Sequence, residues 1–319
     1  MRAMVCHSLS ADRSGLRFES HWPEPAPPGA GEVMVAIGHA ALNYPDLLML
    51  SGGYQFRPEL PFIPGTEASG TVIATGPGAE ALAGARVIVG GRGGCFAERL
   101  TLPASGVRPV PAGLDDAEAA AFTVGALTAW VGLMTRGRLR AGETVLVTGA
   151  GGGMGLAAVA LAAHEGAHVV AVASSAARLD KAVAAGARET IVIDRDSPRF
   201  DRRDIDVVFD PVGGALTIPA LRTLRRNGRY LIIGFVGGAG VVPTNRALLQ
   251  EIEIIGVRAG EYARRDPAAG RRHIAAIDLR AAALRPAIGA MAPLSKSADL
   301  FAAMAAGTLA GKAVVAIDA

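Results

Sequence analysis

Residues 144–155 read TVLVTGAGGGMG, and this stretch decides the fold of the chain. An apolar, β-branched run of strand length changes there into a glycine cluster, and the alanine-rich residues 156–164 that follow predict a helix. Glycines at 149, 152 and 155 permit a tight strand-to-helix turn, close approach of a pyrophosphate to bare backbone, and close packing of helix on sheet. Since a helix N-terminus also offers free N–H groups to phosphates, the stretch predicts a dinucleotide-binding turn.

Short β-branched runs alternate with helical segments over the next hundred residues. Strands are predicted at 168–173, 190–193, 205–209, 230–234 and 252–257, and helices at 176–185, 215–224 and 245–249. Strands that alternate with helices in this way form a parallel, doubly wound sheet. We therefore expect an α/β nucleotide-binding domain with six strands, of which residues 252–257 form the edge strand.

The first 120 residues have a different sequence pattern, in which glycine, proline and short β-branched runs alternate. Strands predicted at 32–39, 70–75, 85–89 and 97–100 indicate a small, mostly antiparallel β domain. After residue 257 the pattern is helical over 266–284 and ends in a strand at 313–317, which we expect to return to the first domain. The predicted domains are 1–121, 122–259 and 260–319, the last being the C-terminal part of the first.

Composition and charge narrow the class of protein. The 319 residues are half apolar and carry a net charge of +3, with arginines scattered along the chain. No basic cluster with interleaved aromatics points to nucleic acid, and no uninterrupted apolar run of membrane-spanning length or signal-peptide pattern occurs. We expect a cytoplasmic protein with neither a nucleic-acid nor a membrane partner.

Cysteine usage bears on metal binding. The two cysteines, Cys6 and Cys95, cannot build a structural zinc site of four thiolates. Reduced, partly buried thiols are the expectation in the cytoplasm, with a disulfide between them as the alternative.

Several motifs, in order, resemble the medium-chain dehydrogenase/reductase superfamily, and within it the zinc-independent quinone oxidoreductases related to zeta-crystallin. The motifs are LNYPD at 42–46, GY at 53–54, PFIPGTEASG at 61–70, GET at 142–144 before the glycine turn, DPVGG at 210–214, GF at 234–235 and GKAVV at 311–315. The resemblance covers nearly the whole chain. It implies a GroES-like β catalytic domain beside a Rossmann-like domain.

The same resemblance shows where zinc ligands are missing. Zinc alcohol dehydrogenases of the superfamily carry a cysteine where Asn43 stands and a histidine where Thr66 stands. Neither replacement is a good zinc ligand, so we expect no metal and no zinc-polarised alcohol oxidation. Glu67 keeps its family position, and we interpret it as a carboxylate that stabilises the turn.

The end of the second nucleotide-binding strand predicts NADPH as the cofactor. An NAD site places an acidic residue about 20 residues past the glycines, but here the strand ends at Ser174 without one, and Arg178 follows. A guanidinium can bind a 2′-phosphate through two hydrogen bonds. The alternative makes Ser174 a helix cap and Arg178 a solvated surface residue. Residues 194–204 are shorter than the family's crossover and lack its tyrosine, which leaves the adenosine contacts open.

In the resembling family, a cleft between the domains holds the nicotinamide. The resemblance implies that Asn43, Tyr54, Thr128, Gly213 and Phe235 line it. It also implies cofactor contacts from the following residues: Gly149, Gly152, Gly153, Met154, Gly155, Gly234 and Lys312. Asn43 and Tyr54 can donate hydrogen bonds to a developing enolate or hydroquinone oxygen. The alternatives are a partly buried loop aromatic for Tyr54 and a helix-interior position for Thr128.

The sequence is compatible with three functions. The first is an NADPH-dependent quinone oxidoreductase, and the second is an NADPH-dependent reductase of enones or enoyl thioesters. The third is a non-catalytic NADPH-binding structural protein. The resembling family joins two edge strands across a twofold axis, so we also expect a homodimer through residues 252–257.

Overall fold

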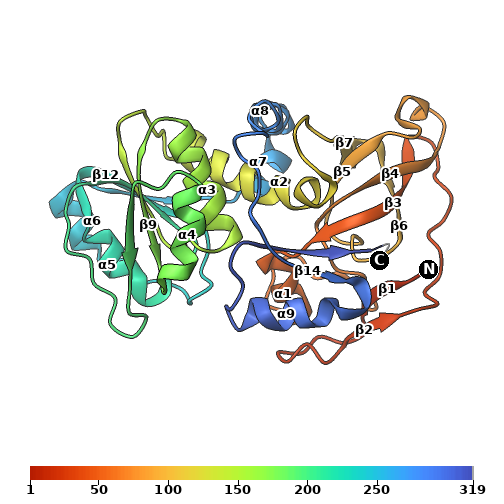
Figure 1. Ribbon diagram of the computed structural model, residues 1–319, viewed down its shortest axis with the longest axis horizontal. Coiled ribbons are helices and arrows are strands. Elements are labelled where there is room, and N and C mark those ends of the chain that lie inside the picture. The colour runs from red at the N-terminus through yellow and green to blue at the C-terminus, as the bar shows by residue number, and fades with distance from the viewer. Residues whose placement is uncertain (318–319) are drawn as a thin grey trace. The chain divides into compact units, whose positions relative to one another are not determined.

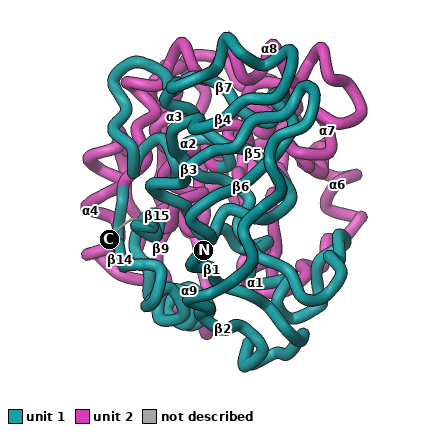
Figure 2. Tube along the Cα trace, turned by 90° about the vertical axis from the view of Figure 1, so that its right-hand side faces the viewer, with its two compact units in different colours: residues 1–124, 288–319 teal, residues 125–287 magenta. Residues whose placement is uncertain are grey.

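The computed structural model describes residues 1–317 and contains two compact units (Figures 1 and 2). The first unit comprises Met1–Val124 together with Ile288–Ala319, and the second comprises Gly125–Ala287. The chain therefore leaves the first unit once and returns to it at its C-terminal end.

The first unit is built on a mostly antiparallel sheet. Its strand order is β14–β15–β3–β4–β5–β7, and β6 pairs with β3. These strands are β3 (Glu32–Ala41), β4 (Glu67–Thr75), β5 (Arg86–Gly90), β6 (Arg99–Pro103), β7 (Val107–Pro109), β14 (Ile288–Pro293) and β15 (Lys312–Ala316). A separate two-stranded sheet holds β1 (Ala3–Cys6) and β2 (Leu16–Glu19).

The C-terminal strand returns to the first unit, as the sequence predicted. β15 pairs antiparallel with β3 in a register that places Val314 opposite Ala41. The helices α1 (Tyr44–Leu50) and α9 (Ser297–Ala305) lie wholly within this unit, and their residues Leu47 and Phe301 are buried in the same apolar core. Because β15 is buried along most of its length, the end of the chain contributes to the core of the domain in which the chain begins.

The second unit has the predicted doubly wound α/β fold. All pairs in its six-stranded sheet are parallel, in the order β10–β9–β8–β11–β12–β13. The strands are β8 (Thr144–Val147), β9 (His168–Ala173), β10 (Glu189–Val192), β11 (Ile205–Asp210), β12 (Leu224–Ile232) and β13 (Glu253–Gly256). β13 lies at the edge of the sheet, as expected.

Helices cover both faces of this sheet. Figure 1 shows α3 (Gly153–His164) and α4 (Ala176–Ala184) on one side, and α5 (Thr217–Leu221) and α6 (Thr244–Gln250) on the other. The predicted helix over 215–224 is wrong at its C-terminal end. Leu224 already pairs with Ile205 as part of β12, and the hydroxyl of Thr223 donates to the carbonyl of Ala220 in the turn between them. Tertiary strand pairing thus overrides the helical pattern at this point.

The observed units differ from the predicted boundary at residue 260. The helices α7 (Ala259–Arg265) and α8 (Pro267–Asp278) belong to the second unit, and the chain enters the first unit again only at Ile288. Side chains near α8 explain the difference. The Arg280 guanidinium donates to Glu165 at 2.7 Å and lies 4.7 Å above the ring of Trp130.

One helical segment is long and apolar enough to cross a membrane by length and composition alone. It consists of α2 (Asp116–Trp130) and the π-helical turn Val131–Arg136. In this structure 56 % of its most apolar window is buried, which is typical of a core helix in a soluble protein. Both cysteines are buried free thiols, so no disulfide links Cys6 to Cys95.

Candidate functional site

The glycine turn between β8 and α3 has the backbone that a phosphate needs. Gly149 has a positive φ of 59°, which favours glycine. A Cβ on Gly155 would lie 2.3 Å from the carbonyl oxygen of Gly149, so this position allows no side chain. A Cβ on Gly152 would lie 3.5 Å from the same oxygen, which is ordinary contact. Packing therefore requires Gly155, whereas Gly152 leaves open backbone.

The N-terminus of α3 is not capped by a side chain. Gly152 is its N-cap residue, with extended φ and ψ of −94° and 164°, and no side chain accepts from the first turn. The first N–H groups of a helix have no partner within it, and a helix dipole favours an anion there. The residues present thus fit the pyrophosphate of a dinucleotide, and Gly153 and Met154 supply the first N–H groups of the helix.

Two arginines lie near the end of β9. Arg178 packs on the glycine turn, since a Cβ on Gly151 would lie 2.6 Å from the Arg178 Cβ. The Arg195 guanidinium donates to the hydroxyl of Ser174 at 3.0 Å. The N-cap of α4 is Ser175, so Ser174 is not the helix cap. Sequence reasoning missed Arg195; its signal was a basic residue in the short crossover where the family has a tyrosine.

Asp210 organises the turn that follows β11. Its carboxylate accepts from the N–H groups of Val212 at 2.9 Å and Gly213 at 3.0 Å. The hydroxyls of Thr148 and Tyr230 also donate to it. Burial raises the pKa of Tyr230, which keeps that phenol protonated and a donor. One buried carboxylate therefore ties the end of β8 to the turn that carries Gly213.

A second glycine turn lies against this one. A Cβ on Gly213 would lie 2.7 Å from the carbonyl oxygen of Gly238, and a Cβ on Gly234 would lie 3.0 Å from that of Pro211. Phe235 projects from the second turn with half of its surface exposed. The structure thus brings Gly213, Gly234 and Phe235 together, as the resemblance implied for one site.

The first unit contains a buried polar cluster of Asn43, Glu67 and Lys312. The Lys312 ammonium donates to the Asn43 Oδ1 at 2.8 Å, to the Glu67 Oε1 at 2.6 Å and to the carbonyl of Leu42 at 3.2 Å. The Asn43 Nδ2 donates to the same Glu67 oxygen at 2.9 Å. The other carboxylate oxygen of Glu67 accepts from the N–H of Val124 at 2.8 Å. Glu67 is therefore the ion-pair partner of Lys312 and also binds an N–H of α2.

Adjacent strands place these three residues side by side. The β15–β3 register, continued two residues beyond the Val314–Ala41 pair, brings Lys312 level with Asn43, and Glu67 pairs with Ala41 at the start of β4. Asn43 lies just before α1, where its N–H donates to the Asp46 carboxylate at 2.8 Å. The side chains of Glu67 and Lys312 are 1 % and 8 % exposed, so the pair is isolated from water.

The donor set of this cluster does not fit a zinc ion. The ammonium of Lys312 already provides the positive charge that compensates Glu67, and Asn43 and Thr66 contribute an amide and a hydroxyl rather than imidazole or thiolate. No group of three or more histidine, cysteine, aspartate or glutamate residues that could hold a metal ion lies within residues 1–317.

Relatives of known sequence share this architecture over most of the chain. Residues 29–112 match the alcohol dehydrogenase GroES-like domain, and residues 153–274 match the family named zinc-binding dehydrogenase. The quinone oxidoreductase-like protein 2 of Bos taurus is 32 % identical over 94 % of this chain and 88 % of its own length. A homologue of that protein from Nematostella vectensis is 36 % identical over 75 % of this chain and 68 % of its own length.

The chain belongs to the medium-chain dehydrogenase/reductase superfamily, among its quinone oxidoreductase-like members.

Solved structures of superfamily members agree with this assignment. The quinone oxidoreductase of Thermus thermophilus, also solved in complex with NADPH, is 30 % identical. It superimposes with a TM-score of 0.85 over 99 % of this chain and 100 % of that chain. A probable oxidoreductase from Mycobacterium abscessus is 33 % identical, with a TM-score of 0.87 over 99 % of both chains. The predicted family and fold class are confirmed.

The resemblance implied two further residues for this quinone oxidoreductase-like protein, Tyr54 in the first unit and Thr128 in the second. Tyr54 is half-buried in the loop after α1 and packs on the apolar core of the first unit. Within the described residues its hydroxyl makes no hydrogen bond to Asn43. Thr128 is half-buried in α2. Their roles toward a ligand stay predictions.

Asp46 makes the stability of the first unit depend on pH. Desolvation by complete burial raises the pKa of Asp46 to about 7, and its Oδ1 has no hydrogen-bond partner. The folded state therefore binds a proton that the unfolded chain releases near pH 4. The contribution of this proton to the free energy of unfolding is therefore present in full below about pH 4, and it is lost as the pH rises to about 7.

Asp46→Asn is expected to remove this part of the pH dependence and to raise the unfolding temperature at about pH 8. Asparagine keeps an oxygen that accepts from the Asn43 N–H and carries no charge. Thermal unfolding from about pH 5 to pH 8 measures the difference, with the exposed Asp299→Asn as control. Parallel curves for wild type and Asp46→Asn would contradict the assignment.

Proposed function

We propose that this chain is a cytoplasmic oxidoreductase that transfers hydride from NADPH to a quinone without zinc. The observation that carries the proposal is the buried Asn43–Glu67–Lys312 cluster, because Asn43 stands where the resemblance implies a cysteine ligand in zinc-dependent members, and Lys312 already compensates the Glu67 charge. The names of the Bos taurus and Thermus thermophilus relatives support quinone reduction. A reductase that delivers hydride to an electron-poor acceptor requires positioning and an anion stabiliser more than a metal.

Bound NADPH would supply the hydride, and residues of this chain would bind and orient it. The pyrophosphate fits the N–H groups at Gly153 and Met154, with Gly149, Gly152 and Gly155 shaping the turn. In this proposal Thr128, Gly213, Gly234 and Phe235 contact the nicotinamide half of the cofactor. Lys312 acts mainly through Asn43, because all three of its protons already have acceptors in the protein.

Asn43 and Tyr54 would stabilise negative charge on the acceptor. The Lys312 ammonium polarises the Asn43 amide through its Oδ1, which makes the Nδ2–H groups stronger donors. One of these groups binds Glu67, and the other has only a long contact of 3.4 Å to the Thr66 hydroxyl. That weakly used N–H is the proposed donor to an enolate or hydroquinone oxygen, with Tyr54 as a second donor.

Cofactor preference follows from the arginines near β9. We expect NADPH to bind at least about tenfold more tightly than NADH, which is about 1.4 kcal/mol. No acidic residue ends β9, and Ser174, Arg178 and Arg195 offer donors to a 2′-phosphate. Fluorescence titration with both cofactors measures the ratio.

Arg178→Ala and Arg195→Ala are expected to weaken NADPH binding and to leave NADH binding within about twofold. The exposed Arg199→Ala, in the same crossover, serves as the matched control. Equal affinities of the wild type for NADPH and NADH would overturn the cofactor assignment.

The acceptor is tested by a single screen. NADPH oxidation is followed with quinones, enones and enoyl-CoA thioesters as acceptors, with wild type and Asn43→Ala compared. Turnover with quinones that falls in Asn43→Ala supports the proposal. Turnover with enoyl thioesters alone would select the second function, and tight NADPH binding without turnover would select a non-catalytic role.

Reduction of enones or enoyl thioesters is the second candidate. A segment of the mycocerosic acid synthase-like polyketide synthase of Mycobacterium tuberculosis is 38 % identical over 221 residues of this chain. The match covers 65 % of this chain but only 10 % of that synthase, so the similarity concerns one part of a much larger protein. The hydride donor and the oxyanion donors would be the same as for a quinone.

We also propose a homodimer through the edge strand β13. Val257 N donates to Ile232 O, and alternation along a parallel strand then directs the Ile254 and Gly256 N–H groups away from β12. Two such edges can pair across a twofold axis.

Ile254→Pro is expected to convert the dimer to a monomer without unfolding the sheet, because only an outward donor is lost. Light scattering at micromolar concentration measures the mass, and the neighbouring Glu253→Ala is the control. A monomeric wild type would contradict the proposal.

A further inference from the structure

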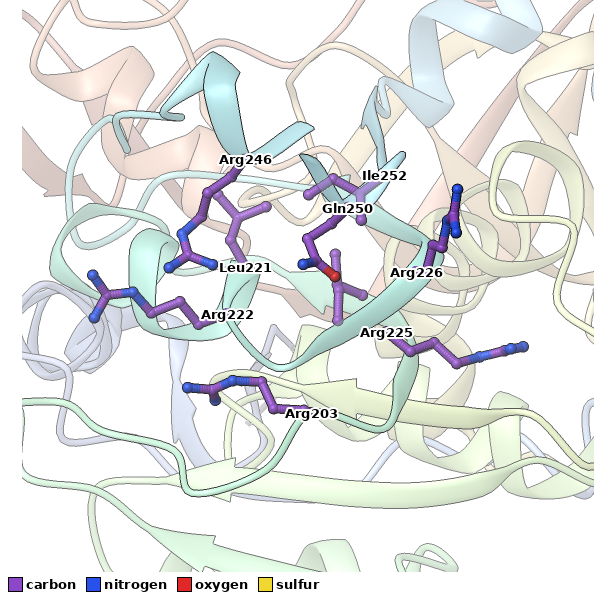
Figure 3. Close-up of a pocket in the computed structure, with 9 residues that line it drawn as sticks. Arg203, Leu221, Arg222, Arg225, Arg226, Arg246, Gln250 and Ile252 are labelled. Carbon is purple, nitrogen blue, oxygen red and sulfur yellow. The ribbon is translucent and has the colours of Figure 1, made fainter. Parts of the chain in front are cut away.

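A cavity of about 340 Å³ in the second unit is lined by five arginines. Figure 3 shows the side chains of Arg203, Arg222 and Arg246 extending to one side of the cavity, and those of Arg225 and Arg226 extending to the other. Such a concentration of positive charge repels itself unless anions lie nearby. The partners of the five guanidinium groups therefore decide what the cavity can bind.

The two groups of arginines differ in their partners. Arg225 forms an ion pair with Asp206, and Arg226 forms one with Glu251. Arg203 donates to the backbone carbonyl of Arg202 at 2.7 Å. Within residues 1–317 no carboxylate forms an ion pair with Arg203, Arg222 or Arg246. Three formal positive charges therefore face one cavity without a protein anion.

A neighbouring cavity of about 250 Å³ shows the usual alternative. It is also rich in arginine, but Arg138 there pairs with Glu253, and Arg229 pairs with Glu143 through two hydrogen bonds of 2.9 and 2.7 Å. Two carboxylates, Glu143 and Glu253, line the second cavity, whereas the described lining of the first contains none. The first cavity therefore offers guanidinium groups to an anion from outside the protein.

The first cavity and the glycine turn lie at opposite ends of the parallel strands. Arg203 precedes β11, Arg222 precedes β12, and Gln250 precedes β13, so the cavity is at the amino ends of these parallel strands. The glycine turn follows the carboxyl end of β8 in the same sheet. A ligand in this cavity would therefore not occupy the cofactor site.

We propose that this cavity is a second anion site, which binds a small ligand that carries a diphosphate group. Guanidinium groups match phosphate oxygens through paired N–H donors, and three of them line this cavity from three different segments. The Gln250 amide adds a neutral donor. The volume exceeds the roughly 30 Å³ of one water many times, so it can hold more than a single phosphate. Buried Leu221, Leu224 and Ile252 give it an apolar floor for the rest of the ligand.

The experiment is calorimetric titration of the full chain with inorganic pyrophosphate and, separately, with ADP. The test variant is Arg222→Ala/Arg246→Ala. The control variant is Arg138→Ala/Arg265→Ala, which removes the same charge from carboxylate-paired, exposed positions of the second unit. We expect the test variant to bind pyrophosphate at least about tenfold more weakly, and the control to change less than about threefold.

The relative affinities of ADP and pyrophosphate identify the group that the cavity binds. Tighter binding of ADP than of pyrophosphate assigns the site to a nucleotide, and equal binding assigns it to the diphosphate group alone. Equal losses in both variants would show general charge attraction, and absence of binding by the wild type would exclude the ligand class; either result overturns the proposal. This comparison does not depend on the proposed function, because neither variant alters the glycine turn.

A competition arm uses wild type saturated with NADPH and so rests on the proposed function. Retained pyrophosphate binding supports a separate site, and full displacement would place the anion at the glycine turn and overturn the proposal. Unchanged thermal unfolding of both variants verifies that the fold is intact.

Discussion

Gly155→Ala is expected to disrupt the turn between β8 and α3 and to abolish measurable NADPH binding. The added Cβ would lie 2.3 Å from the Gly149 carbonyl oxygen and 2.7 Å from the Ala150 Cα, so backbone atoms must move. Forcing an atom into a packed site costs about 1–3 kcal/mol. Thermal unfolding and fluorescence titration with NADPH measure the two effects.

Gly152→Ala separates phosphate binding from packing. Its Cβ would make only an ordinary contact, and its backbone is extended, so we expect a stability change within about 0.5 kcal/mol. The same methyl group would cover the backbone that a pyrophosphate approaches, so NADPH binding should weaken at least about tenfold. The exposed Gly260→Ala is the control. Normal NADPH binding by the Gly155→Ala variant of the preceding prediction would show that close packing at residue 155 is not required for the phosphate-binding turn.

Lys312→Ala is expected to destabilise the first unit by about 3–5 kcal/mol. The substitution would leave the Glu67 carboxylate, 1 % exposed, without its ammonium partner. It would also free the Asn43 Oδ1 that the ammonium holds. Urea unfolding followed by circular dichroism measures the loss, and the exposed Lys296→Ala should change stability by less than about 0.5 kcal/mol.

A double variant distinguishes lost charge compensation from lost packing. Glu67→Gln/Lys312→Met removes both charges and keeps similar volume, so it should recover at least half of the stability lost in Lys312→Ala. Hydride-transfer activity should remain low in the double variant, because the Asn43 amide is no longer polarised. A Lys312→Ala protein as stable as wild type would show that the ion pair contributes nothing to the fold.

Local patterns were sufficient to predict most of the fold. The run before Gly149 became β8, the glycines became its turn, and the alternation that follows became a six-stranded parallel sheet with β13 at its edge. These features depend on residues close in sequence, whose spacing sets backbone conformation and the buried face. The prediction was wrong at 222–224 and at residue 260, where contacts with distant residues decide the outcome.

Some residues of the candidate site could likewise be assigned from sequence, and others only from the tertiary structure. Gly149, Gly152 and Gly155 could be assigned from sequence because one turn contains them all. The family resemblance also implied that Asn43 and Thr66 stand where zinc-dependent members carry ligands. Sequence could not show that Lys312 binds Asn43, since 269 positions separate them and only the β15–β3 register brings them together.

Partners far apart in the sequence also explain why the charged groups near β9 and in the arginine-lined cavity were found only in the tertiary structure. Arg195 lies 21 positions from the Ser174 hydroxyl that it contacts, and Arg246 shares a cavity with Arg203 from another segment. A run of sequence determines periodicity, turns and caps, because those depend on neighbouring dihedral angles. Which charges find partners depends on how strands pair and where loops end, and a long-range contact of that kind leaves no local signal in the chain.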